Sequence, residues 1–186
     1  MDSERARALN APFASERLRF EPLTGAHADE CFEPLQHAKI YTWISTGVPS
    51  SVEQLREDWK RSENPLSPDG AEAWLAWIVR RSSDGVCIGK LDANVNYEGV
   101  ATNVGYMFFP AHWGRGYATE SVRALAAQLE EQGVLRMYAA VTAGNDASGR
   151  VLEKAGFVRT RIIPENDTIR GVKYDDIEYV REIIAR

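Results

Sequence analysis

The chain has 186 residues, of which 44% are hydrophobic and 26% are charged, a balance that fits one soluble domain with a substantial core. The net charge of −5 comes without a long basic run, which argues against a nucleic-acid partner. The sequence has no run of 18 apolar residues and no signal-peptide pattern, so we expect a cytoplasmic protein with no membrane partner.

The histidines and cysteines do not indicate a metal site. His27, His37 and His112 have no ligand spacing with one another or with cysteine, so no metal is predicted. Cys31 and Cys87 are isolated in the sequence, and each is predicted to be a buried small hydrophobe rather than half of a disulfide.

The N-terminal third predicts an extension, a strand and two helices. Residues 1–14 are polar and rich in alanine and are expected to be a frayed N-terminal extension, whereas residues 15–186 form a single domain. Residues 17–23 alternate as a strand, Thr24 caps a helix through Leu35, and Ser51 caps a second helix.

Two aromatic residues between these helices are candidates for substrate binding. Tyr41 and Trp43 lie in the irregular stretch 39–49, before the second helix. They either wall a substrate site or simply cover the core, and the sequence leaves both interpretations open.

An antiparallel meander follows the loop at residues 63–70. Strands are predicted at residues 73–79, 86–96 and 103–109, with a hairpin turn at 82–85. Asp92, Asn94 and Asn96 share one face of the middle strand. That face is either solvated or part of a site, and Asn94 is the candidate substrate-binding residue.

The third strand of the meander leads into a glycine-containing turn and then a helix over residues 115–132. Gly114 and Gly116 allow positive φ angles and close approach of a ligand to the backbone. The first N–H groups of the helix lack partners and carry the positive end of its dipole, so a phosphate or pyrophosphate fits there. The alternative is a tight turn into a core helix. Neither a Walker-type loop nor the dinucleotide fingerprint is present.

The remaining residues complete a mixed sheet. Strands are predicted at residues 135–143, 157–163 and 172–184, with a short helix opening at 144–148 and a polar turn at 164–168. The fold class is α/β (α+β), with seven mostly antiparallel strands, about four helices and a right-handed crossover around the glycine turn.

Three sequence blocks resemble one family, and the resemblance runs from about residue 15 to residue 182. Trp113-Gly-Arg-Gly-Tyr-Ala-Thr-Glu120 resembles the acetyl-coenzyme A loop of the GNAT acetyltransferases, usually Arg/Gln-x-x-Gly-x-Gly/Ala, which falls on Trp113, Gly116 and Ala118. Trp113 departs from the superfamily pattern, but this form is common in the RimJ/RimL branch, which acetylates ribosomal-protein N-termini. Residues 145–157 and 16–23 resemble the second block and the first strand of that branch.

The resemblance implies a sheet that splays open between the strand ending near Phe109 and the strand ending near Thr142. The pantetheine arm of the co-substrate acetyl-CoA would lie in that gap, and the pyrophosphate would lie on the N–H groups of residues 115–118. The implied cofactor-binding residues are Met107, Phe109, Trp113, Gly114, Arg115, Gly116, Tyr117, Ala118, Thr119, Asn145 and Ser148.

The resemblance also implies catalytic roles. Ser148 would donate a proton to the sulfur of coenzyme A, and a backbone N–H near Met107 or Phe108 would stabilise the oxyanion. Ser148 and Asn145 have alternative roles as helix-capping residues. The general base stays open among Glu21, His112, Glu165, Asp176 and water.

These implications predict an acyltransferase, specifically an N-acetyltransferase that acts on a protein N-terminal amine. One alternative is an enzyme for a small amine such as an amino acid, a polyamine or an aminoglycoside. Others are a non-catalytic CoA-binding module and a phosphate- or nucleotide-binding protein of another kind. Monomer and homodimer are both open.

Overall fold

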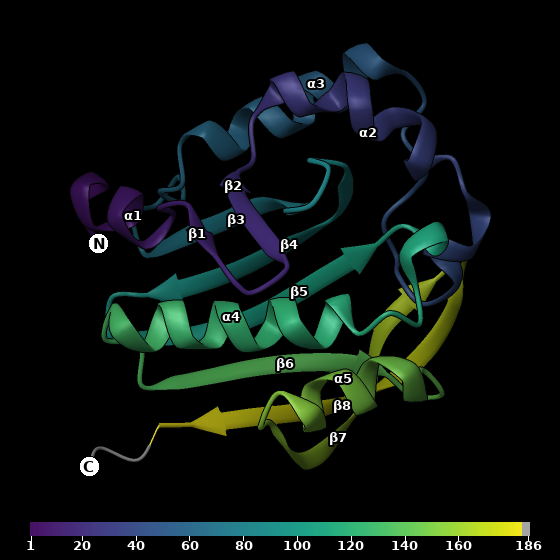
Figure 1. Cartoon of the computed structure of the whole chain (residues 1–186). Helices are drawn as coiled ribbons and strands as arrows, with labels where there is room; N and C mark the ends of the chain where they lie inside the picture. The colour runs from purple at the N-terminus through teal and green to yellow at the C-terminus, as the bar shows by residue number, and fades with distance from the viewer. Residues whose placement is uncertain (184–186) are drawn as a thin grey trace.

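The computed structural model describes residues 1–183, and these residues form one eight-stranded mixed sheet (Figure 1). The strand order is β1-β2-β3-β4-β5-β6-β8-β7, and every neighbouring pair is antiparallel except β5 and β6. The strands are β1 (Phe13–Ala14), β2 (Leu18–Pro22), β3 (Glu72–Arg81), β4 (Cys87–Asn96), β5 (Val100–Phe108), β6 (Arg136–Thr142), β7 (Val158–Ile169) and β8 (Val172–Glu182).

Helices cover both faces of the sheet. The α-helices are α1 (Ser3–Leu9), α2 (Ala28–Leu35), α3 (Val52–Lys60), α4 (Tyr117–Glu131) and α5 (Asp146–Lys154). Short 3-10 turns lie at Gly25–His27, Ala38–Thr42, Arg61–Glu63 and Pro110–His112. Within residues 1–183, no helix combines the length and the hydrophobicity needed to cross a membrane.

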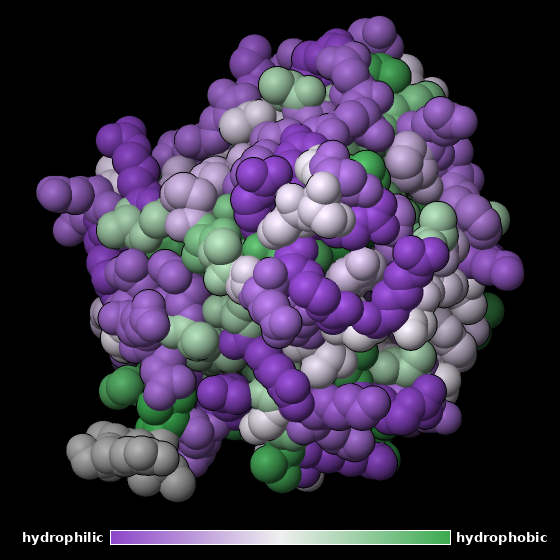
Figure 2. All heavy atoms as spheres, viewed as in Figure 1, coloured by the Kyte–Doolittle hydropathy of each residue, from purple (hydrophilic) through white to green (hydrophobic). Residues whose placement is uncertain are grey.

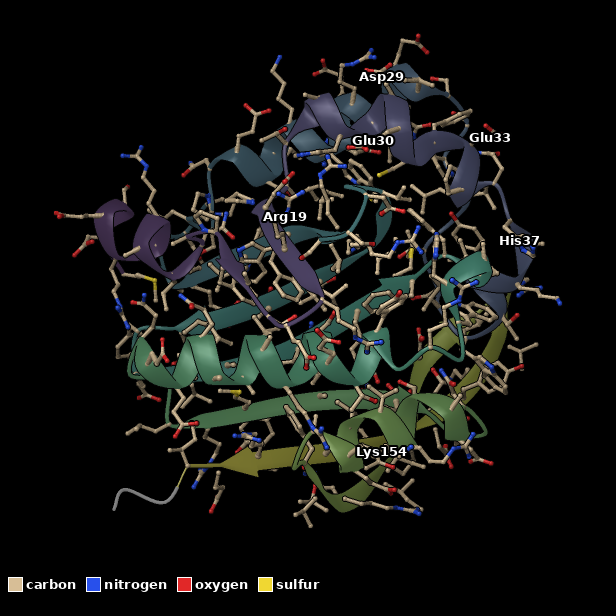
Figure 3. The ribbon with its side chains drawn as sticks, in the orientation of Figure 1. Arg19, Asp29, Glu30, Glu33, His37 and Lys154 are labelled. Carbon is tan, nitrogen blue, oxygen red and sulfur yellow. The ribbon has the colours of Figure 1, made fainter. Side chains whose placement is uncertain are left out.

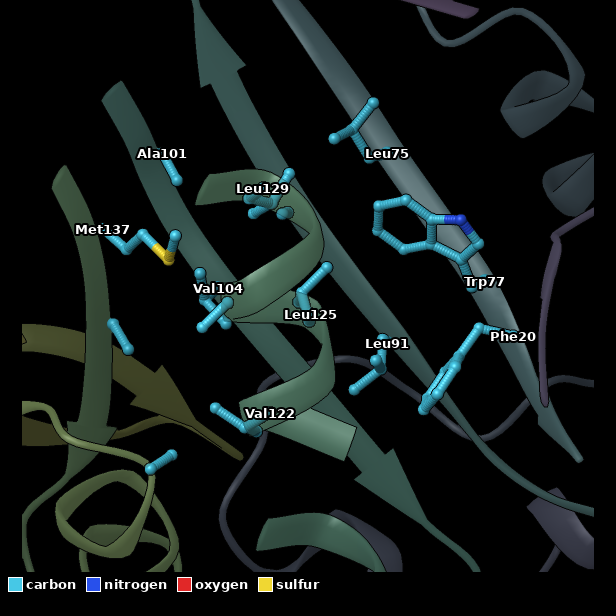
Figure 4. Close-up of a cluster of buried hydrophobic side chains, with 14 of the residues drawn as sticks. Phe20, Leu75, Trp77, Leu91, Ala101, Val104, Val122, Leu125, Leu129 and Met137 are labelled. Atoms are coloured by element: carbon cyan, nitrogen blue, oxygen red, sulfur yellow. The ribbon is translucent and has the colours of Figure 1, made fainter. Parts of the chain in front are cut away.

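The main core lies between the sheet and α4. Val122, Leu125 and Leu129 recur at helical spacing, and all three are fully buried. They pack toward Leu91 and Val104 of the sheet (Figure 4). Each such side chain contributes about 1.5–3 kcal/mol on burial, so this contact fixes α4 on the sheet.

A second, smaller core lies on the opposite face. Alternate residues of β3 serve the two cores, so Trp77 faces α4 whereas Ala76 and Ile78 face α2 and α3. We call the two sides the α4/α5 face and the α2/α3 face. Cys31 of α2 and Cys87 of β4 meet in this core with their sulfurs 3.4 Å apart, so these cysteines are neighbours in space rather than isolated.

The sheet opens between β5 and β6. These parallel strands pair only at Val100 with Arg136 and at Ala101 with Met137. Beyond this point β5 stays paired with β4 as far as Phe108, and β6 stays paired with β8 as far as Thr142. The predicted splay is therefore present, and it leaves one backbone edge of each strand unpaired.

The N-terminal residues are folded, so the expectation of a frayed extension is wrong. Ala6 and Leu9 of α1 are fully buried in the main core. The side-chain oxygen of Asn10 accepts a hydrogen bond from the backbone N–H of Ala76 at 3.1 Å, and Phe13 stacks on Phe20. A helix of seven residues with only two buried apolar side chains is too short to give a periodic pattern. This segment adds α1 and β1 to the predicted seven strands and four helices.

The C-terminal hairpin also differs from the prediction. The polar stretch 164–168 is part of β7 rather than a turn, and the chain reverses at Arg170 and Gly171 instead. Glu165 has a φ of 50° at an irregularity in the register between β7 and β8, which explains the turn-like sequence. The last strand ends at Glu182, and Ile184 lies outside the described residues.

Glu120 ties the N-terminal segment to the start of α4, so its role is structural. Its Oε1 accepts hydrogen bonds from the Ser15 hydroxyl at 2.7 Å and the Arg17 backbone N–H at 2.8 Å, and Arg17 Nε donates to Oε2 at 2.7 Å. Burial acts to raise the pKa of Glu120, but these hydrogen bonds outweigh it, and the net pKa lies below the ordinary value.

We expect Glu120→Gln to lower the free energy of unfolding by about 2 kcal/mol at neutral pH, because the variant loses charge-assisted hydrogen bonds. A carboxyl group with a lowered folded-state pKa stabilises the fold above its unfolded pKa, and that stability is lost as the pH falls through the folded pKa. Urea unfolding should therefore show a difference between wild type and variant that shrinks below about pH 4.5. Glu57→Gln, on an exposed side chain, is the control and should change little.

Candidate active site

The glycine turn has the geometry of an anion site. Gly114 and Gly116 have φ angles of 74° and 79°, and Gly116 is the N-cap of α4. The indole N–H of Trp113 donates to the carbonyl of Phe108 at 2.6 Å, which ties the turn to the end of β5. The first N–H groups of α4 have no partners within the helix and carry its positive dipole end.

A cavity of about 280 Å³ lies against this turn. One wall is the turn itself, with Gly116, Tyr117, Ala118 and Thr119, and the other wall is α5. Arg150 and Lys154 lie one helical turn apart on α5 and both line the cavity (Lys154 is labelled in Figure 3). The two cations and the start of α4 therefore give this cavity a positively charged lining, which suits an anion. The sequence reasoning missed these two cations, although their spacing of four residues was a usable signal.

A larger cavity of about 560 Å³ continues from the turn into the gap between β5 and α5. It brings together predicted residues from four separate parts of the chain. They are Trp43 from the stretch before α3, Met107 and Phe108 from β5, Trp113, Gly114 and Ala118 from the turn, and Asn145 and Ser148 from α5. The sequence order alone does not show that these parts meet.

Ser148 has a partner that the sequence reasoning missed. The Tyr106 hydroxyl lies 2.6 Å from the Ser148 hydroxyl and also donates to the Ser148 carbonyl at 3.0 Å. Burial raises the pKa of Tyr106 to about 12, although the bond to Ser148 acts in the opposite direction. Tyr106 therefore stays protonated at neutral pH. Asn145 accepts a hydrogen bond from the backbone N–H of Ser148 at 3.3 Å and so caps α5.

Some predicted residues lie outside the cavity. Tyr41 is buried and donates to the carbonyl of Leu35 at 2.7 Å. Phe109 is buried in the core under α2. Arg115 is exposed, and its carbonyl accepts a hydrogen bond from Arg17. Asn94 lies on the α2/α3 face, where its carbonyl accepts a hydrogen bond from Thr102 at 3.3 Å.

The candidate bases are dispersed. Glu21 is paired with Arg80 under α2, and Glu165 is paired with Lys173 in the C-terminal hairpin. Asp176 is buried in β8 and accepts a hydrogen bond from Asn166 at 2.7 Å. None of these three carboxylates lines the large cavity.

His112 lines the same 280 Å³ cavity as Gly116 and Arg150, beside the glycine turn. Burial, followed by the nearby Arg81 and Arg115, lowers its pKa.

The molecular surface over α4 and α5 is mostly hydrophilic, with small apolar areas between the polar groups (Figure 2).

A mixed sheet that opens between two parallel strands, with a glycine turn at the start of the following helix, is the arrangement of the GNAT fold. The family model for the acetyltransferase (GNAT) domain matches residues 17–158. The chain therefore belongs to the GNAT acetyltransferase family, and the predicted fold and enzyme class are confirmed at this level.

Comparisons with individual proteins agree with this assignment. The uncharacterized N-acetyltransferase YoaA of Bacillus subtilis is 31% identical over 107 residues, which are 56% of this chain and 60% of YoaA. The chain matches 36–60% of the length of YoaA and of two other curated proteins of Bacillus subtilis, YkkB and YjcK.

Solved structures show a similar fold over nearly the whole chain. RimL, a ribosomal L7/L12 alpha-N-protein acetyltransferase solved in complex with coenzyme A, has a TM-score of 0.81 at 18% identity and covers 93% of this chain and 98% of RimL. Ribosomal-protein-S5-alanine acetyltransferase from Vibrio fischeri has a TM-score of 0.78 at 17% identity, covering 92% and 96%.

The raised pKa of Tyr106 is open to a direct test. When the tyrosinate absorbance of the Tyr106→Phe variant is subtracted from that of wild type, we expect no difference through pH 10 and a signal that rises toward pH 12. The reason is that burial disfavours the charged phenolate. A difference signal with its midpoint near pH 10 would show that Tyr106 is solvated instead.

Proposed function

We propose that this chain is an acetyl-CoA-dependent N-acetyltransferase that transfers an acetyl group to a primary amine, with a protein N-terminus as acceptor. One observation carries the proposal: the cavity at the start of α4 adjoins the larger cavity, with Gly114 and Ala118 lining both, and the larger cavity reaches the hydroxyl groups of Ser148 and Tyr106. A phosphate-bearing carrier bound at one end therefore presents its far end to proton donors at the other.

The residues present fit acetyl-CoA. The pyrophosphate would accept hydrogen bonds from the N–H groups of residues 115–118, with Arg150 and Lys154 supplying positive charge. The pantetheine arm would lie beside Met107 and Phe108, where the edge of β5 is not paired with β6. Bound acetyl-CoA supplies an activated thioester carbonyl.

The reaction needs a neutral amine, a polarised carbonyl and a proton for the departing thiolate. The ammonium form of the acceptor first loses one proton to water. The neutral nitrogen then forms a bond to the acetyl carbon while the carbon–sulfur bond breaks, the nitrogen gives a second proton to water, and the sulfur gains one from Ser148. A backbone N–H of Met107 or Phe108 would stabilise the negative charge that develops on the carbonyl oxygen, an effect worth about 3 kcal/mol.

Ser148 would donate the proton to sulfur, and Tyr106 would support that donation. A serine alkoxide is a much stronger base than a thiolate, so Ser148 can protonate the thiolate only if the Ser148 oxygen receives another proton at the same time. The Tyr106 hydroxyl lies 2.6 Å from the Ser148 hydroxyl and is protonated at neutral pH. It would turn its proton from the Ser148 carbonyl to the Ser148 side-chain oxygen and then regain a proton from solvent.

The preference for a protein N-terminus rests on the RimJ/RimL-like form of the glycine turn and on the similarity in fold to RimL. A small-amine acetyltransferase, a non-catalytic CoA-binding module and a nucleotide-binding protein of another kind remain the alternatives. The acidic chain suits a basic acceptor but does not select one. Thiol release from acetyl-CoA, measured over peptides, blocked lysine, amino acids, polyamines and aminoglycosides, separates the catalytic alternatives.

Gly116→Val should abolish acetyl-CoA binding in calorimetric titration, because the side chain blocks approach of the phosphates to the backbone. Gly171→Val is the matched control, since Gly171 also has positive φ but lies in the turn between β7 and β8. Both variants should lose about 1–2 kcal/mol of stability from left-handed strain. Normal acetyl-CoA binding by Gly116→Val would contradict the proposed phosphate site.

Ser148→Ala should lower kcat by about 100-fold while changing the Kd for acetyl-CoA little, because general-acid catalysis is lost and cofactor binding is not. Tyr106→Phe should lower kcat by about tenfold. The double variant should be no slower than Ser148→Ala, because Tyr106 acts through Ser148. Additive losses would show that the two hydroxyl groups act separately, and an unchanged rate in Ser148→Ala would leave Ser148 only its structural role.

A further inference from the structure

A third cavity, of about 250 Å³, passes through the sheet at the gap between β5 and β6. Its lining includes Tyr106, Ser148 and Leu152 on the α4/α5 face and Lys90, Asp92 and Asn103 on the α2/α3 face. A single cavity lined from both faces means that a group entering from the α2/α3 side reaches the Ser148 hydroxyl without crossing the glycine turn.

Asp92 is placed in this passage by the absence of a side chain at Gly105. The two residues are paired across β4 and β5. A Cβ atom added at Gly105 would lie 2.2 Å from Asp92 Oδ2, so the carboxylate occupies the space that any other residue would fill. Gly105 immediately precedes Tyr106, and the Asp92 carboxylate is therefore held beside the strand that carries the proposed proton donor.

The carboxylate of Asp92 retains hydrogen-bonding capacity. Lys90 forms an ion pair with Oδ1 at 2.8 Å, and Asn103 makes a long contact with Oδ2 at 3.5 Å, so an incoming ammonium would share the carboxylate with Lys90. An ionised carboxylate has about four acceptor sites, so two are filled by neighbours among the described residues. Asp92 is 32% exposed, which leaves it accessible from the cavity.

Other carboxylates do not share this position. Glu21 and Glu165 form ion pairs away from the passage, and Asp176 is in β8 beside Thr142 without lining the cavity. Asp92 is the one carboxylate in the lining of the passage through the sheet, as described over residues 1–183.

We propose that Asp92 binds the amino group of the acceptor, which enters from the α2/α3 face as an ammonium ion and is held by this carboxylate beside the thioester. The bound ammonium loses one proton to water, and the neutral nitrogen then attacks the acetyl carbon. This inference rests on the proposed function and names the residue that recognises the acceptor. The acceptor class is a primary amine that is cationic in water, and the sheet beyond Asp92, with Asn94 and the half-exposed Trp74, offers a surface for the residues after a peptide N-terminus.

The test compares Asp92→Asn with wild type in thiol release from acetyl-CoA, using a tetrapeptide amide with a free N-terminus, α-blocked lysine and spermidine as probes. We expect the KM for the amine to rise ten- to a hundredfold, because a charge-assisted hydrogen bond is lost. The Kd for acetyl-CoA should change less than twofold. Asp29→Asn, the same change on an exposed side chain of α2, is the control.

A double-mutant cycle between Gly105 and Asp92 keeps the test of amine binding independent of folding defects. Gly105→Ala should raise the amine KM in the wild-type background, because the new methyl group displaces the Asp92 carboxylate. In the Asp92→Ala background the same substitution should have no further effect, because the obstructing carboxylate is gone.

An unchanged amine KM in Asp92→Asn, with an active wild type, would overturn the inference and leave the proposed function intact. Additive effects of Gly105→Ala and Asp92→Ala would also overturn it. A wild-type chain that binds acetyl-CoA but acetylates no amine would contradict the proposed function. It would also contradict the role of Asp92 in binding the acceptor, because that role depends on the proposed function.

Discussion

The separation of β5 from β6 after only two paired residues is the constraint on which the site depends. Strands that stay hydrogen-bonded elsewhere hold the two edges apart, because β5 remains on β4 and β6 remains on β8. The gap then connects three features that lie far apart in the sequence. The anion site at Gly116 and the hydroxyl pair of Tyr106 and Ser148 are on one face, and Asp92 is on the other.

In the proposed reaction, the two faces of the sheet have different tasks: the α4/α5 face binds the acetyl carrier and the α2/α3 face binds the acceptor. On the α4/α5 face, burial fixes α4 through Val122, Leu125 and Leu129, and this places the positive end of the helix at the mouth of the cavity. On the α2/α3 face the smaller core leaves the polar residues of β4 reachable beside the gap. A carrier on one face and an acceptor on the other would meet at the gap, as direct transfer between them requires.

Local patterns were sufficient for much of the fold and for part of the site. The alternation of the meander strands, the spacing along α4 and the glycines at positions 114 and 116 predicted the elements and the anion site from the sequence. The expectation of a frayed N-terminal extension was wrong because α1 has only two buried apolar residues, which are too few to show a helical hydrophobic period. Tyr106 and Asp92 were missed as partners because their roles come from contacts between elements, across 42 residues to Ser148 and across the strand pair to Gly105.

The central claim is that the glycine turn and the gap bind acetyl-CoA, and calorimetric titration of the intact chain with acetyl-CoA tests it most directly. The account predicts saturable binding with one site per chain and a Kd in roughly the micromolar range, about −8 kcal/mol. AMP, which lacks the pantetheine arm, should bind far more weakly. The absence of binding heat with acetyl-CoA, or equal binding of AMP, would contradict the account.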